Sequence, residues 1–209
     1  MYFITHFFLG FITSFLGSIP PGTVSNNILR ITIASGTKIA LRFIAGATIA
    51  EFIYCFLATH FSSYLISVSG LHQTIRLVSI PIFITIAIVL LVKKIKPPAL
   101  NSKVESHRSY IFQGIGIGLL NPLQLPFWLT YGAYFISVGW LKDETVLLNT
   151  FIIGVCSGSF VCLTSISLLA NSYKNSPFLK ERTINVVTAV ILIALACYQL
   201  FDYYLASKK

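Results

Sequence analysis

Charged residues are scarce in this chain. Only 10% of its 209 residues are Asp, Glu, Lys or Arg, whereas soluble domains carry about 25%. Six long stretches hold no charge or one: residues 1–29, 43–75, 77–92, 109–141, 145–173 and 183–201. A helix that crosses a bilayer needs about 20 apolar residues, so each stretch predicts one spanning helix, and the stretch at 77–92 reaches that length with its flanks. This composition excludes a water-soluble domain.

The apolar stretches also lack the alternation of apolar and polar residues that a transmembrane barrel requires. Residues 80–92 and 186–196 are apolar on every side, so helices are expected. The first stretch has no basic segment before it and no small-residue cleavage site at the usual distance. We therefore expect a retained helix there and not a signal peptide.

Patterns for cofactor or catalytic chemistry are missing as well. The cysteines lie inside apolar stretches and form no C-x-x-C pair, so they are interpreted as small core residues. No two histidines have the spacing of metal ligands, and no G-x-S-x-G, Walker or zinc-protease motif occurs. We expect no enzymatic activity, no metal site and no cofactor.

The chain is nevertheless basic, with a formal net charge of +9. Eleven of its 15 Lys and Arg residues lie in alternate connections, near residues 38, 100 and 177. Positively charged connections stay in the cytoplasm, so these three are predicted to lie inside and both termini outside. Because this orientation accounts for the charge, nucleic-acid binding is rejected.

Six helices are predicted, at 3–33, 38–60, 72–95, 107–137, 145–172 and 181–205. A polar linker at 96–107 separates a three-helix repeat at 1–95 from a second at 108–209, within one integral membrane domain. Both halves carry G-x-x-x-P in their first helix, at residues 17–21 and 118–122. An odd number of helices per half inverts the second half relative to the first. The predicted fold is an all-α membrane protein of two inverted repeats, whose first and fourth helices are broken at Pro and Gly.

Polar residues gather at these two breaks. Pro20 and Pro21 lack an N–H and clash with the preceding turn, and Gly22 permits a change of direction. Each helix that restarts after a break points the positive end of its dipole at the break, which suits a carboxylate ligand. Matched breaks in an inverted repeat indicate a transporter's binding site. The alternative is two packing kinks, with the asparagines bonded between helices.

Glu51 is the one acid between residues 43 and 75, and it lies well inside the second predicted helix. A charge at that depth costs about 2.5–3.5 kcal/mol on insertion scales, so it should face the protein interior. It is interpreted as a proton carrier or as the counter-ion of a substrate amine. The alternative is a structural acid bonded to a neighbouring helix, or one close to the surface. The predicted substrate- and ion-binding residues are Pro20, Pro21, Gly22, Thr23, Asn26, Asn27, Glu51, Asn121, Pro122 and Gln124.

Four features together resemble a known family. They are P-P-G-T-V-S-N-N-I-L at 20–29, S-G-T-K-I-A-L-R at 35–42, Gly46 with Glu51, and F-Q-G-I-G-I-G-L-L-N-P at 112–122. With them the chain is similar, over nearly its whole length, to the lysine exporter superfamily of LysE/RhtB-type amino-acid exporters. It departs from the common form of that family, which has P-G-P in the first motif and Asp at the position of Glu51.

The resemblance implies a secondary active transporter. It would export an amino acid or a related small zwitterion across the bacterial plasma membrane, coupled to a proton or sodium gradient. Its expected partners are that substrate, a coupling ion and membrane lipid, and a homodimer stays open. A second hypothesis is an intramembrane redox or assembly protein, which would need Cys55 to meet Cys156 or Cys162 across the halves. A pore is a third.

Overall fold

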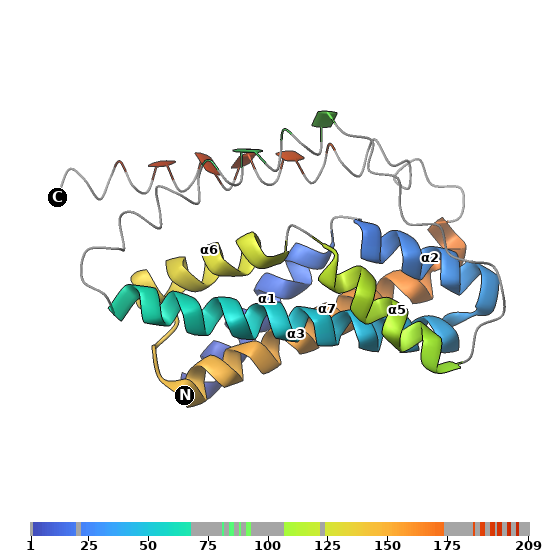
Figure 1. The fold of residues 1–209 in the computed structure, drawn as a ribbon, viewed down its shortest axis with the longest axis horizontal. Coiled ribbons are helices and arrows are strands. Elements are labelled where there is room, and N and C mark those ends of the chain that lie inside the picture. The colour runs from blue at the N-terminus through green and yellow to red at the C-terminus, as the bar shows by residue number, and fades with distance from the viewer. Residues whose placement is uncertain are drawn as a thin grey trace.

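The computed structural model describes residues 2–19, 22–67, 107–121 and 124–173 continuously, together with scattered positions between 81 and 204. Every element within these residues is an α-helix (Figure 1). The predicted all-helical class is therefore confirmed. The helices predicted at 72–95 and 181–205 lie largely outside the described residues, and so does the linker at 96–107.

The first predicted helix is two helices in the structure. α1 (Tyr2–Ser18) and α2 (Thr23–Ser35) meet at a bend of 73°. The helix predicted at 107–137 is likewise divided into α5 (His107–Leu119) and α6 (Gln124–Ser137). The three prolines Pro20, Pro21 and Pro122 lie outside the described residues, so their part in these interruptions stays a prediction.

Two long helices form the centre of the bundle. α3 (Thr37–Ser67) extends beyond the range predicted for it, while α7 (Thr145–Tyr173) agrees with its prediction to one residue. Both are long and apolar enough to cross a membrane, and the bent pair of α1 and α2 gives a third candidate span among the described residues. α1 and α5 begin at opposite ends of the bundle and both end near its middle (Figure 1).

Glycines let α1 and α7 pack with their backbones in contact. A Cβ atom added to Gly10 of α1 would overlap the carbonyl oxygen of Phe151 in α7. In the opposite direction, a Cβ atom on Gly154 of α7 would overlap the carbonyl oxygen of Phe7 in α1. Small residues at helix contacts are typical of membrane proteins, because apolar side chains gain little by leaving lipid.

α3 and α5 pack in the same way. A Cβ atom on Gly46 of α3 would overlap the carbonyl oxygen of Ile111, and one on Gly114 of α5 would overlap the carbonyl oxygen of Phe43. In each of the two helix pairs, both helices thus provide a glycine at the contact. In the pairs α1–α7 and α3–α5 the backbones of the two helices are thus in direct contact.

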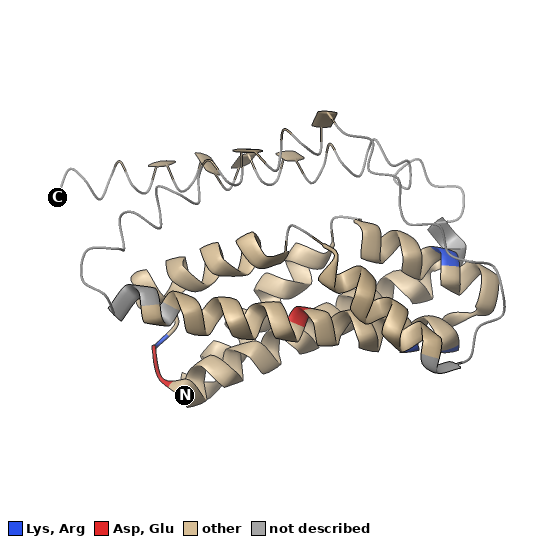
Figure 2. Ribbon diagram, in the orientation of Figure 1, with Lys and Arg blue, Asp and Glu red and all other residues tan. Residues whose placement is uncertain are grey.

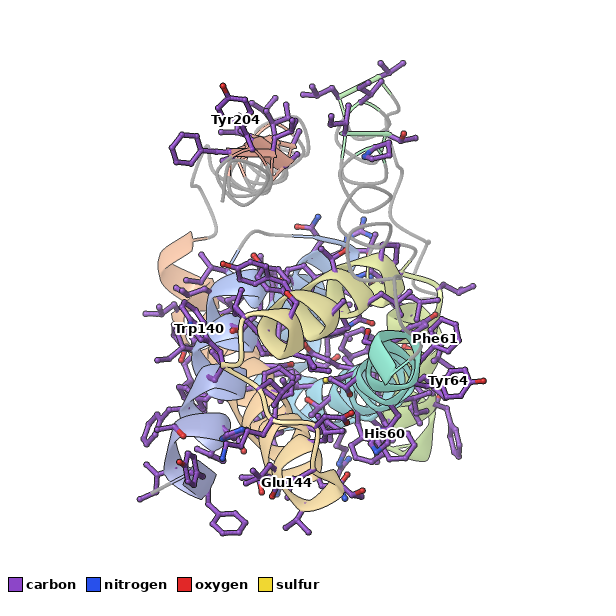
Figure 3. The ribbon with its side chains drawn as sticks, turned by 90° about the vertical axis from the view of Figure 1, so that its left-hand side faces the viewer. His60, Phe61, Tyr64, Trp140, Glu144 and Tyr204 are labelled. Atoms are coloured by element: carbon purple, nitrogen blue, oxygen red, sulfur yellow. The ribbon has the colours of Figure 1, made fainter. Side chains whose placement is uncertain are left out.

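Charged residues stand near the two ends of the bundle, apart from one acidic position midway along α3 (Figure 2). The exposed side chains between the ends are apolar, as a lipid-facing surface requires. Figure 3 looks along the bundle and shows Phe61 and Tyr64 of α3 on its outer side, away from α1. These two side chains are 52% and 66% exposed.

A buried histidine ties the start of α1 to the connection between α6 and α7. Lys142 donates its backbone N–H to Nε2 of His6 at 3.0 Å, so the other ring nitrogen must carry the proton. That nitrogen, Nδ1, donates to the carbonyl oxygen of Tyr2 at 2.6 Å. The Lys142 ammonium lies 3.7 Å from the centre of the Tyr2 ring, which adds a cation–π contact between the same two segments.

Replacing His6 with Ala is expected to lower the free energy of unfolding by about 1–3 kcal/mol, because a partly buried backbone N–H loses its acceptor. Thermal denaturation in detergent measures this. His60→Ala is the matched control, since its ring bonds only Phe56 of its own helix at an exposed site and should change little. Equal losses in both variants would contradict a bridging role for His6.

Candidate functional site

Glu51 lies midway along α3 and is 7% exposed, so it faces the interior of the bundle. Ser14 of α1 donates a 2.9 Å hydrogen bond from its Oγ to Oε1 of Glu51. Ser159 of α7 is fully buried and lies beside the same carboxylate, within reach of a hydrogen bond to it. Three helices therefore converge on the one acid of the spanning segments that the structure describes.

The end of α1 and the start of α6 meet close to this acid. Ser14 lies in the last turns of α1, and Gly17 follows it by three residues. A Cβ atom on Gly17 would stand 2.9 Å from Cζ of Phe127, in the first turn of α6. The end of α1, before the first interruption, thus contacts the start of α6, after the second interruption.

The end of α5 adjoins Glu51 from another side. Gly118 faces the methyl group of Ala50, the residue before Glu51, and a Cβ atom there would come within 2.6 Å of it. One turn further along α3, the Tyr54 hydroxyl donates a 2.5 Å hydrogen bond to the carbonyl oxygen of Leu119. The last turn of α5 is therefore held against the part of α3 that carries the acid.

Gly22 is the N-cap of α2 and has extended backbone angles, with φ −119° and ψ −163°. Its carbonyl oxygen accepts the Asn26 N–H at 3.0 Å, and no side chain caps this helix start. Thr23 and Asn26 are half-buried. The structure shows no side-chain cap from these polar residues among those described. Among the described residues, no side chain therefore accepts from the first N–H groups of α2.

Asn27 is fully buried in the second turn of α2. Its Nδ2 donates to the carbonyl oxygen of Thr23 at 2.8 Å, which leaves Oδ1 as a buried acceptor without a partner. The neighbouring Ile28 packs in a cluster with Ile44 of α3 and Leu163 of α7. Asn27 therefore lies in the layer where α2 meets both central helices.

Backbone hydrogen bonds lie on both sides of the second interruption. Asn121 donates its N–H to the carbonyl oxygen of Gly118 at 3.1 Å, and its own carbonyl oxygen accepts the Gln124 N–H at 3.3 Å. Gln124 begins α6, and its Oε1 is buried without a partner. Asn27 and Gln124 thus each bring an unpaired acceptor close to an interruption, as a site for a ligand with N–H groups would.

Sequence reasoning missed Ser14, Ser159 and Tyr54. A signal for Ser159 was present, because it follows Gly154 by the same five positions by which Glu51 follows Gly46. Those two glycines make equivalent backbone contacts in α7 and α3. Ser14 and Tyr54 carry no comparable signal, since hydroxyl side chains are common in membrane helices.

Comparison with known proteins adds a family to this geometry. The family model described as LysE type translocator matches residues 15–202, which is most of the chain. The matched segment includes both interruptions, Glu51 and the whole of α7. Searches of curated proteins and of solved structures found no significant match. The resemblance seen in the motifs is confirmed, and the chain belongs to the LysE type translocator family.

Proposed function

We propose that this multi-pass membrane protein is a secondary active transporter. It exports an amino acid or a related small zwitterion across the bacterial inner membrane, driven by a proton or sodium gradient. Family membership supports a transporter of amino acids or related compounds. One observation carries the mechanism: Glu51 is buried midway along a spanning helix, hydrogen-bonded to Ser14 beside the end of α1. Intramembrane acids of this kind mark ion and substrate pathways.

The proposed architecture is an inverted repeat of residues 1–95 and 108–209, joined by the cytoplasmic linker at 96–107. The support for this architecture is that the first helix of each repeat packs against a helix of the other repeat. Gly10 of α1 approaches the backbone of α7, while Gly114 of α5 approaches that of α3. A two-fold axis in the membrane plane relates two repeats in this manner and places the binding site between them.

The substrate would lie between the two interruptions. Its carboxylate would meet the uncapped N–H groups at the start of α2, near Gly22 and Thr23, where the helix dipole is positive. Its ammonium group would satisfy the buried acceptors Asn27 Oδ1 and Gln124 Oε1. Asn26 and Asn121 would complete the lining, with Pro20, Pro21 and Pro122 keeping the helices interrupted.

The proposed orientation has both termini outside. Its support among the described residues is the charge at the two ends of the bundle. Arg30, Lys38 and Arg42 lie around the connection between α2 and α3, which is assigned to the cytoplasm. The opposite end carries Lys142 between α6 and α7, next to Asp143 and Glu144.

Reconstituted protein provides the direct test. Proteoliposomes preloaded with one unlabelled amino acid at a time should take up the same labelled compound by exchange. An outward substrate flux should rise when a proton or sodium gradient is imposed. We expect saturation with substrate concentration, as for a carrier. A flux that is high and non-saturating would indicate a pore, and no exchange with any member of an amino-acid panel would contradict the proposal.

The redox alternative rests on one contact, because Cys55 of α3 and Cys156 of α7 pack in the same apolar cluster. The described cysteines are free thiols. Replacing all four cysteines with Ala is expected to leave gradient-driven transport within about twofold of the wild type, since apolar packing at these positions changes little. Initial efflux rates in proteoliposomes measure this. Loss of transport in a folded cysteine-free variant would favour the redox reading.

A further inference from the structure

We infer that Tyr54 and Ser62 of α3 are positioning residues for the substrate site, because their hydroxyl groups attach both sides of the second interruption to α3. Tyr54 donates to a backbone carbonyl oxygen of α5, and Ser62 donates to one of α6. The inference rests on the proposed function where it connects this interruption with the substrate. The attachment of α5 and α6 to α3 stands on the two contacts alone.

The Tyr54 hydroxyl satisfies the end of α5. Leu119 is the last residue of this helix, so its carbonyl oxygen has no N–H group of the helix to accept from. Tyr54 donates to that oxygen at 2.5 Å. It follows Glu51 by three residues, near the middle of α3, where lipid supplies no replacement donor. Without this hydroxyl, the end of α5 has to move to find another partner for its carbonyl oxygen.

The Ser62 hydroxyl attaches the first turns of α6 to the same helix. Ser62 follows Tyr54 by eight residues, which is about two turns, so the two side chains lie on neighbouring parts of one face of α3. Ser62 Oγ donates to the carbonyl oxygen of Leu129 at 3.2 Å. Gly132, almost one turn further along α6, allows this close approach, since a Cβ atom there would stand 3.4 Å from Ser62 Oγ.

Gln124 lies between these two attachments. Asn121 donates its N–H to the carbonyl oxygen of Gly118 and accepts the N–H of Gln124, so backbone bonds connect Gln124 to the end of α5. Gln124 Oε1 is the buried acceptor that we assign to the ammonium group of the substrate. Binding groups must be held in place by the residues around them. Loosening α5 or α6 should therefore weaken substrate binding, although neither hydroxyl touches the substrate.

Tyr54→Phe tests the inference, because it keeps the ring against the apolar cluster of α3, α6 and α7 and removes only the hydroxyl. The KM for amino-acid exchange in proteoliposomes should rise about three- to tenfold, with the maximal rate within about twofold of the wild type. Ser62→Ala should raise KM by less, since its bond is longer. Hydrogen–deuterium exchange of the full-length protein in lipid should show faster exchange of the Asn121 and Gln124 amides in Tyr54→Phe.

Tyr2→Phe is the matched control, because this tyrosine side chain is 59% exposed at the start of α1 and should leave KM and amide exchange unchanged. Unchanged amide exchange in Tyr54→Phe would show that its hydroxyl does not fix the end of α5. Faster amide exchange with an unchanged KM, or a fall in the maximal rate alone, would overturn the positioning role. A wild type that exchanges no amino acid would refute the proposed function, while the amide exchange would still decide whether α3 fixes this interruption.

Discussion

Glu51→Gln is expected to reduce gradient-driven efflux from proteoliposomes to the level of empty liposomes. The amide has nearly the shape of the carboxyl group and can still accept the hydrogen bond from Ser14. It cannot take up or release a proton, so net movement coupled to the gradient stops. Exchange of labelled for unlabelled substrate needs no net proton transfer, and we expect the variant to retain it.

Two comparisons make this result specific. Glu144→Gln removes an exposed acid in the connection before α7 and should transport like the wild type. Glu51→Asp keeps a carboxylate on a shorter side chain and should retain part of the gradient-driven rate. If Glu51→Gln transports fully under a gradient, Glu51 is a structural acid bonded to its neighbouring helices.

Gly114→Ala is expected to destabilise the protein by roughly 3 kcal/mol, at the upper end of the range for overpacked positions. The added methyl group would overlap the carbonyl oxygen of Phe43, which belongs to the backbone of α3. No rotamer change relieves such a clash, so α3 and α5 must separate along their shared contact. Thermal denaturation in detergent and the monodispersity of the purified protein would report the loss.

Gly116→Ala, two residues away on the same helix, is the matched control. No heavy atom lies within 4 Å of a Cβ atom placed there. Alanine favours a helix over glycine by up to about 1 kcal/mol, so this variant should be neutral or slightly stabilised. Similar losses in the two variants would show that helix propensity, and not backbone contact, decides stability on α5.

The positions of the two long central helices could be predicted from the sequence. Stretches with no charge or one predicted α3 and α7, since a spanning helix must be apolar along a bilayer's thickness. The G-x-x-x-P motifs at 17–21 and 118–122 coincide with the ends of α1 and α5. The spanning helices depend on local chemistry, because a charge is expelled from lipid wherever the chain folds. The part that the prolines take in the interruptions stays a prediction.

The neighbours of Glu51 could not be predicted in this way. Ser159 is 108 positions away in the chain and reaches the acid only because α3 packs against α7. Ser14 reaches it because α1 ends beside the middle of α3. Such contacts depend on the register between helices, which the glycines set through backbone approach and which hydropathy does not encode.

The amino-acid sequence by itself thus determined that the chain is a helical membrane protein and that Glu51 needs an interior position. Bilayer thickness and the loss of hydration impose both on any fold of this chain. Only the tertiary structure decided which side chains meet the acid. A donor on α1 and a buried hydroxyl on α7 are brought to it by helix packing, and that packing is a property of the whole bundle.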